Sequence, residues 1–124
     1  MPKQILSTPS APAALGPYSV GVEANGIVFF SGQIALDGDG NPAGTTAEQA
    51  QQVMEQIGRL LADVGLMFSD LVKATIFLAD INDFAAVNEV YGSFFDSEPP
   101  ARSAVEVAAL PKGVAVEIET IAAR

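Results

Sequence analysis

The 124-residue sequence contains no cysteine and no histidine. Without them the chain can form no disulfide, offers no thiol nucleophile and cannot assemble a Ser-His catalytic site. The usual zinc ligand sets are excluded as well. Any chemistry must therefore use carboxylates, arginine, tyrosine, hydroxyl groups, the few lysines or the backbone, and we expect neither a metal nor a cofactor.

Positive charge is scarce, because fifteen acidic residues outnumber six basic ones and the net charge is -9. Such a field repels phosphate backbones and anionic lipids, so we expect no nucleic acid and no membrane as partner. It also disfavours small anionic substrates unless a local cation receives them. Arg102 is one of only three arginines; Arg59 falls within a predicted helix and Arg124 ends the chain.

Long apolar runs are also missing. No run is long enough to span a bilayer, and the N-terminus lacks the basic and apolar regions of a secretory signal. We therefore expect a cytoplasmic protein by default. The length and the 49% hydrophobic content predict a single domain over residues 1–124 with a substantial core.

Hydrophobic periodicity predicts an α+β fold with the order β-β-β-α-β-α-β-β. The dipeptide Asn25-Gly26 suits a two-residue hairpin turn between two strands, and Thr45 and Glu48 form a capping box that opens a helix. The other predicted elements are strands near 3–7, 71–78, 102–108 and 114–121 and a second helix from about residue 82. Both helices are expected on one face of a mixed sheet, which leaves the other face to self-association.

The last two predicted strands carry the candidate chemistry. If they form a hairpin about Leu110-Pro-Lys-Gly, Arg102 lies close to Ile118 and therefore beside Glu117 or Glu119. A guanidinium fork next to a carboxylate could hold a small acid and handle a water beside it.

Simpler roles for these residues stay open at this point. Arg102 could merely pair with Glu106, Glu117 or Glu119 on the sheet, and Glu119 is better read as structural than as catalytic. Tyr18, on a proline-rich loop, could be a packing aromatic, and Ser31 has no base partner. The loop that begins Asp37-Gly-Asp-Gly imitates a calcium-binding spacing, but Pro42 stands where that loop needs glycine, which favours an ordinary turn.

Four motifs occur in a characteristic order and spacing. They are Gly16-Pro-Tyr18; Ser31-Gly-Gln33; Asn82-Asp-Phe84 with Asn88 and Tyr91; and Pro100-Ala-Arg-Ser103 followed by Val105-Glu-Val107, Leu110-Pro-Lys112 and Glu117-Ile-Glu119. Together they resemble the Rid (YjgF-type) family of 2-imino acid deaminases, and specifically its RidA branch. The likeness covers nearly the whole chain.

The resemblance implies a chorismate-mutase-like fold and a homotrimer with clefts between subunits. It implies hydrolysis of reactive 2-imino and enamine acids, such as 2-aminoacrylate and 2-aminocrotonate, to 2-oxo acids and ammonia. Arg102 would grip the substrate carboxylate, Glu117 would handle the attacking water and Tyr18 would form a cleft wall. Ser31 and Gly32 would line the cleft. Ala104 stands where many relatives carry cysteine, yet its backbone N–H is still able to bind the carboxylate.

Two other functions remain as alternatives. Similar proteins have been described as chaperone-like, translation-inhibiting or ribonucleolytic, so a non-catalytic role that binds small carboxylates or regulates other proteins is the second reading. The acidic charge and the missing histidine argue against RNA cleavage. Chorismate mutase activity would rest on shared fold alone, and fold is weak evidence of function.

Overall fold

The computed structural model describes residues 2–124, and its elements follow the predicted order. The strands are β1 Gln4–Ile5, β2 Gly21–Ala24, β3 Ile27–Gln33, β4 Leu71–Leu78, β5 Ala101–Glu106 and β6 Val116–Ala123. The α-helices are α1 Thr46–Asp63 and α2 Phe84–Gly92, and three single 3₁₀ turns, η1 Phe68–Asp70, η2 Ile81–Asp83 and η3 Pro111–Gly113, lie in the connections.

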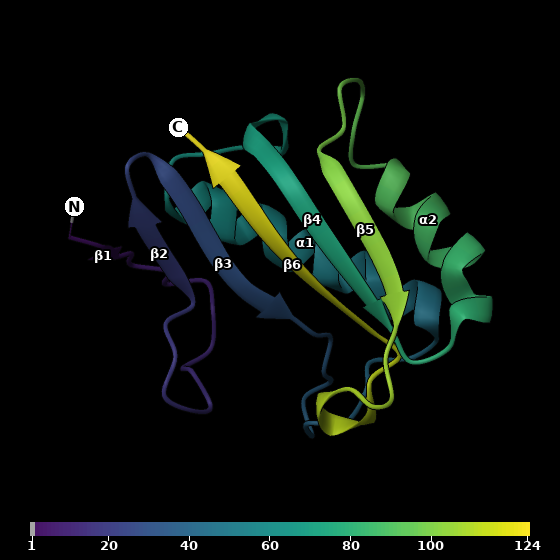
Figure 1. Ribbon diagram of the computed structural model, residues 1–124. Coiled ribbons are helices and arrows are strands. Elements are labelled where there is room, and N and C mark those ends of the chain that lie inside the picture. The colour runs from purple at the N-terminus through teal and green to yellow at the C-terminus, as the bar shows by residue number, and fades with distance from the viewer. Residues whose placement is uncertain (1) are drawn as a thin grey trace.

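The strands form one mixed sheet in the order β1-β2-β3-β6-β4-β5 (Figure 1). β6 lies in the middle and pairs antiparallel with both β3 and β4. β4 and β5 pair in parallel, joined by a crossover through α2. β5 is therefore an edge strand, with one row of backbone groups not paired within the sheet.

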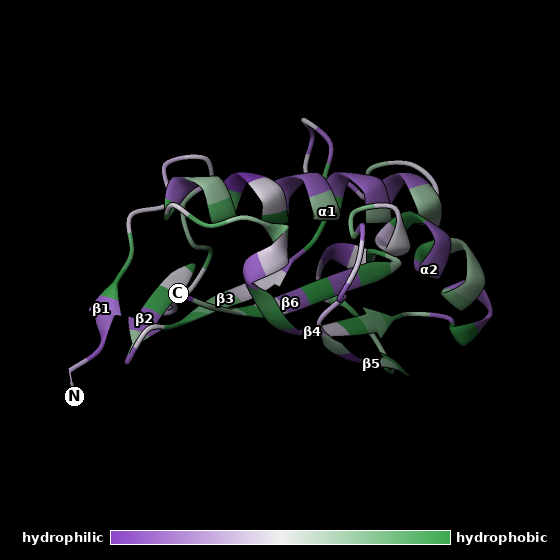
Figure 2. Cartoon of the chain, turned by 90° about the horizontal axis from the view of Figure 1, so that it is seen from above, coloured by the Kyte–Doolittle hydropathy of each residue, from purple (hydrophilic) through white to green (hydrophobic). Residues whose placement is uncertain are grey.

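Both helices cover the same face of the sheet, as predicted (Figure 2). α1 begins at Thr46, and the preceding Thr45 caps it with the predicted capping box, in which the side chains of Thr45 and Glu48 each accept the backbone N–H of the other. Its apolar stripe packs on the buried residues of β3, β4 and β6, and this layer is the hydrophobic core. The buried stripe of α1 consists of Ala50, Val53, Met54, Ile57, Leu60 and Leu61.

In the part of the chain that the structure describes, no helix lies on the opposite face of the sheet. Along β6, Val116, Ile118, Thr120 and Ala122 are buried beneath the helices, whereas the alternate residues Glu117, Glu119, Ile121 and Ala123 point to the open face. Phe29 on β3 and Val105 on β5 lie on this open face with 45% and 42% of their surface exposed. Apolar side chains in such positions fit a surface that a partner covers.

The predicted hairpin between β2 and β3 is confirmed. Asn25 and Gly26 have φ angles of 52° and 77°, the left-handed pair that a tight two-residue turn requires. The second helix begins slightly later than predicted, because residues 81–83 form a 3₁₀ turn before α2 starts at Phe84.

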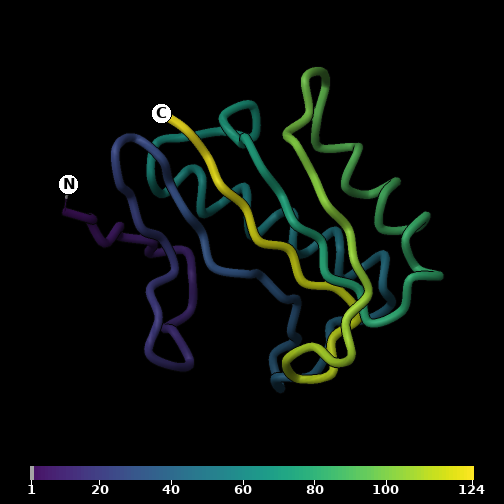
Figure 3. The backbone as a smooth tube through the Cα atoms, in the orientation of Figure 1, coloured from purple at the N-terminus to yellow at the C-terminus, as the bar shows by residue number. Residues whose placement is uncertain are grey.

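The predicted hairpin between β5 and β6 is wrong. Figure 3 shows the connection passing across the end of β4, so that β5 and β6 lie on opposite sides of that strand. The crossing is fixed by two hydrogen bonds, from Val107 N to Leu78 O and from Ala79 N to Ala115 O. A turn sequence shows that the chain reverses direction, but it does not show whether a third strand inserts between the two that it joins.

Neither α-helix among residues 2–124 combines the length and the apolar character that crossing a membrane requires.

Candidate active site

Glu117 on β6 lies directly over the backbone of Gly32 on β3. The pairing of these strands shifts between Phe30–Thr120 and Gln33–Ile118, so Ser31 and Gly32 together oppose a single residue in a β-bulge. A Cβ built on Gly32 would lie 2.9 Å from Cδ of Glu117 and would collide with its carboxylate. Only glycine leaves this space, so the bulge and the acid form one unit, the glutamate cluster of Ser31, Gly32 and Glu117.

The environment of Glu117 favours its protonated form. Partial burial raises the pKa of its carboxyl above the ordinary value of 4.5, and the negative charge of Glu119, two residues along the same face, raises it further. A carboxylic acid whose pKa is raised towards neutrality is suited to accept and return a proton.

Two glutamine side chains hold the bulge against α1. Gln56 donates through Nε2 to Oε1 of Gln33 at 3.3 Å and to the carbonyl of Ile34 at 3.0 Å. Gln33 in turn donates to the carbonyl of Ser31 at 3.4 Å, and Ser31 N donates to Val20 O at 2.8 Å. These bonds restrain the strand end that carries Gly32. Gln56 was not among the site residues predicted from the sequence.

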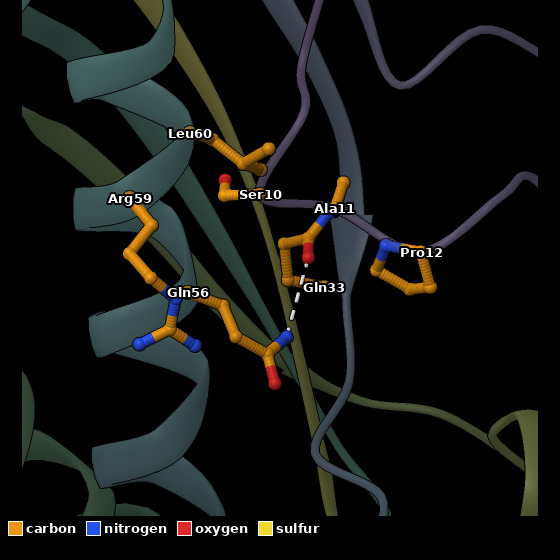
Figure 4. A pocket seen from close by; sticks show the side chains of 7 residues that line it. All are labelled: Ser10, Ala11, Pro12, Gln33, Gln56, Arg59 and Leu60. Atoms are coloured by element: carbon orange, nitrogen blue, oxygen red, sulfur yellow. Dashed lines mark hydrogen bonds between the residues drawn. The ribbon is translucent and has the colours of Figure 1, made fainter.

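A small cavity lies beside these glutamines (Figure 4). Its volume is about 20 Å³, which is room for roughly one water molecule and not for a substrate. It is lined by Ser10, Ala11, Pro12, Gln33, Gln56, Arg59 and Leu60. We therefore assign this cavity to the packing of the strand end and not to chemistry.

Arg102 on β5 lies on the helix side of the sheet, against α2. Its Nη1 donates to Oδ1 of Asn88 at 2.6 Å. Its guanidinium carbon lies 5.4 Å from the ring centre of Phe84 and 5.1 Å from that of Tyr91, within the range of cation–π attraction. These four residues form the arginine cluster.

Among residues 2–124, no carboxylate joins the arginine cluster. Within residues 2–124 the recorded salt bridge is that of Arg124 with Glu23, and Arg102 makes none. Glu106, a candidate partner in the sequence, instead accepts the backbone N–H of Ile81 at 2.8 Å. Arg102 is thus a half-buried cation with a neutral acceptor in a strongly acidic chain.

The structure does not bring Arg102 beside Glu117 within one chain. Arg102 aligns with Ala74 of β4 and through it with Thr120 of β6, three residues beyond Glu117. The backbones of Arg102 and Glu117 are therefore two strand spacings, about 10 Å, apart across the sheet. They are also three residues, about 10 Å, apart along the strand direction. The odd offset also puts the two side chains on opposite faces of the sheet, so the predicted adjacency is wrong.

The remaining candidates lie apart from one another. Tyr18 is half exposed on its loop, where its hydroxyl lies 3.5 Å from Leu15 N, and no recorded hydrogen bond in the described chain joins it to Arg102 or Glu117. Ala104 lies on the edge strand β5, two residues after Arg102 and on the same face.

The loop from Asp37 is a tight turn. Oδ1 of Asp37 accepts the backbone N–H groups of Asp39 and Asn41 at 2.8 and 3.0 Å. Among residues 2–124, no group of acidic, cysteine or histidine side chains is arranged to hold a metal ion.

Residues 8–124 match the family described as Endoribonuclease L-PSP. The chain belongs to this family. A protein from Capra hircus named 2-iminobutanoate/2-iminopropanoate deaminase is 50% identical over 97% of this chain and 89% of its own length.

Solved structures agree with this assignment to the L-PSP family. YyfA from Yersinia pestis, described as a member of the conserved Rid protein family, superposes with a TM-score of 0.92 at 42% identity, covering 99% of this chain and 100% of its own. E. coli TdcF with bound serine gives a TM-score of 0.89 at 43% identity, covering 98% of each chain. The resemblance to Rid proteins that the motifs indicated is confirmed.

Proposed function

We propose that this member of the L-PSP family hydrolyses small 2-imino acids and their enamine tautomers to 2-oxo acids and ammonia. Relatives named 2-iminobutanoate/2-iminopropanoate deaminase are up to 50% identical over nearly the whole chain. The observation that carries the proposal is the half-buried guanidinium of Arg102, which lies against two aromatic rings and Asn88 but has no carboxylate partner among residues 2–124.

The substrate carboxylate is the natural partner of that guanidinium. A planar fork binds a carboxylate through two parallel hydrogen bonds, which fixes the orientation of the attached C=N carbon. The backbone N–H of Ala104 on the edge strand is our candidate for a further bond to the same carboxylate. The serine bound to TdcF carries a carboxylate and a nitrogen on one carbon, the arrangement that a 2-imino acid also has.

Glu117 then handles the water. In a 2-iminium acid the C=N carbon is electrophilic already, so the reaction needs positioning and proton transfer more than a nucleophilic side chain. Water adds to that carbon and gives one proton to Glu117, which passes it to the nitrogen. The C–N bond then breaks and ammonia leaves, while the hydroxyl group formed from the water gives its remaining proton to Glu117 as the C=O bond forms. Such acid–base assistance typically contributes on the order of 10²- to 10⁴-fold in rate.

The two clusters must come from different copies of the chain to act on one substrate. We propose a homotrimer in which the arginine cluster of one copy meets the glutamate cluster of its neighbour across an inter-subunit cleft. The open face of the sheet, with exposed Phe29 and Val105, supports such an interface. Tyr18 and Ser31 would line the same cleft, with Tyr18 as its wall.

A coupled assay tests the activity. A pyridoxal-phosphate-dependent dehydratase generates 2-aminocrotonate or 2-aminoacrylate in situ, and the decay of the enamine absorbance is followed with and without this protein. We expect a catalysed decay proportional to protein concentration. Unchanged decay together with retained binding of 2-oxobutanoate would favour the non-catalytic carboxylate-binding alternative instead.

RNA cleavage is not favoured, although the family description names an endoribonuclease. The chain has no histidine for acid–base catalysis and a net charge of -9, which repels the phosphate backbone.

A further inference from the structure

The side of α2 that faces Arg102 presents three residues at helical spacing. Phe84, Asn88 and Tyr91 stand at positions i, i+4 and i+7 and so share one face of the helix. All three contact the guanidinium, the two rings through their faces and Asn88 through its side-chain carbonyl. One helix face thus supplies the hydrogen-bond acceptor and both aromatic rings that contact this cation.

The hydrogen bond to Asn88 occupies only part of the guanidinium fork. Nη1 donates to Oδ1 of Asn88 at 2.6 Å. Among residues 2–124, no recorded hydrogen bond uses Nε or Nη2 of Arg102. These two atoms form the side-on edge of the fork, which is the edge that binds a carboxylate through two parallel bonds.

Asn88 does not need this bond for its own solvation. Its side chain is exposed, so water would satisfy the amide if Arg102 turned away. Such an exposed bond adds little to folding stability. Its main consequence is geometric, since it selects one rotation of a long and flexible side chain.

We propose that Asn88 is a positioning residue for Arg102. Its carbonyl fixes the plane of the guanidinium across Phe84 and Tyr91 and keeps the Nε–Nη2 edge free for the substrate carboxylate. This inference rests on the proposed function, because it names the residue that prepares the proposed carboxylate site. Asn88 touches no reacting atom and acts only through Arg102.

Preorganisation of this kind is expected to affect substrate capture more than turnover. In the full-length protein, Asn88→Ala should raise KM for 2-iminobutanoate and the Kd for 2-oxobutanoate about tenfold, with kcat changed less than about threefold. Asn88→Asp should raise both constants further, because its carboxylate competes with the substrate for the same guanidinium. Glu89→Ala, the exposed neighbour on α2, is the matched control and should leave all three constants unchanged.

A double-mutant cycle separates positioning from a general effect on the fold. Lysine has no fork to orient, so Asn88→Ala should cost almost nothing in an Arg102→Lys background. The melting temperature of Asn88→Ala should stay within about 2 °C of the wild type, because the bond is exposed.

Each outcome has a definite reading. If the wild type neither hydrolyses 2-iminobutanoate nor binds 2-oxobutanoate, both the proposed function and the proposed role of Asn88 are wrong. If the wild type does both and Asn88→Ala matches it, the proposed function stands and the role of Asn88 is overturned. An equal loss in the wild-type and Arg102→Lys backgrounds also overturns it, because Asn88 would then act independently of the fork.

Discussion

The carboxylate of Glu117 occupies the space that a side chain on Gly32 would fill. A Cβ at position 32 would lie 2.9 Å from Cδ and 3.1 Å from Cγ of the glutamate. The position of the Glu117 carboxylate, the proposed proton-transfer group, therefore depends on residue 32 having no Cβ.

The first prediction concerns the missing Cβ of Gly32. Gly32→Ala should push the carboxylate of Glu117 aside and lower kcat for imine hydrolysis by about 10²-fold, because a displacement of about 1 Å costs that much in a positioned reaction. KM should change less, since Arg102 is untouched. Gly38→Ala is the matched control, because a Cβ on Gly38 meets nothing within 4 Å. Equal kcat for the two variants would contradict a role for the packing of Glu117 on Gly32.

The second prediction is a pH shift. Burial and the charge of Glu119 both raise the pKa of Glu117, and the base must be ionised to take a proton from water. Activity should therefore fall as the pH drops through this raised pKa, which lies above the ordinary value of 4.5. Glu119→Gln removes the smaller of the two causes, so the acid limb of the kcat/KM profile should move to lower pH without reaching the ordinary value. An acid limb that does not move would remove Glu119 from the electrostatics of the site.

The third prediction tests whether the planar guanidinium of Arg102, and not only its positive charge, binds the substrate carboxylate. Arg102→Lys keeps the positive charge but loses the planar pair of donors, so kcat/KM should fall by at least about tenfold, mainly through KM. Steady-state kinetics with 2-iminobutanoate measures both constants. Retention of the wild-type kcat/KM would show that Arg102 does not clamp the substrate carboxylate.

The sequence predicted the order of elements, the hairpin at Asn25-Gly26 and the start of α1, because these depend on local periodicity, turn residues and capping. It failed at the pairing of β5 with β6. Whether a strand inserts between two others depends on contacts between segments far apart in the sequence, and here β4 inserts between β6 and β5. Arg102 and Glu117 were both singled out, yet their separation follows from that insertion and could not be read from spacing.

The contacts around these residues were harder to foresee. Asn88 could have been linked to Arg102 only by noticing its helical spacing from Phe84 and Tyr91. Gln56 lies on the half-buried side of α1, and nothing in its local sequence indicates that it reaches the backbone of the bulge.

The fourth prediction concerns two buried hydroxyl groups. Oγ1 of Thr120 and the hydroxyl of Tyr91 have no hydrogen-bond partner among residues 2–124. A buried hydroxyl without a partner typically costs about 1–3 kcal/mol. Thr120→Val and Tyr91→Phe should each therefore raise the free energy of unfolding, by about 1 kcal/mol, in urea denaturation at fixed protein concentration. A loss of stability in either variant would show that its hydroxyl has a partner in the assembled protein.

The fifth prediction concerns the assembly of the site from two copies. Arg102→Ala and Glu117→Gln should each be nearly inactive alone. When the two variants are co-expressed and assemble at random, half of the copies keep Arg102 and half keep Glu117. About one quarter of inter-subunit sites should then contain both native residues, and about one quarter of the wild-type activity should return. Mixing either variant with itself is the control. If the site lay within a single chain, every copy in the mixture would lack one of the two groups and no activity would return, whatever the oligomeric state.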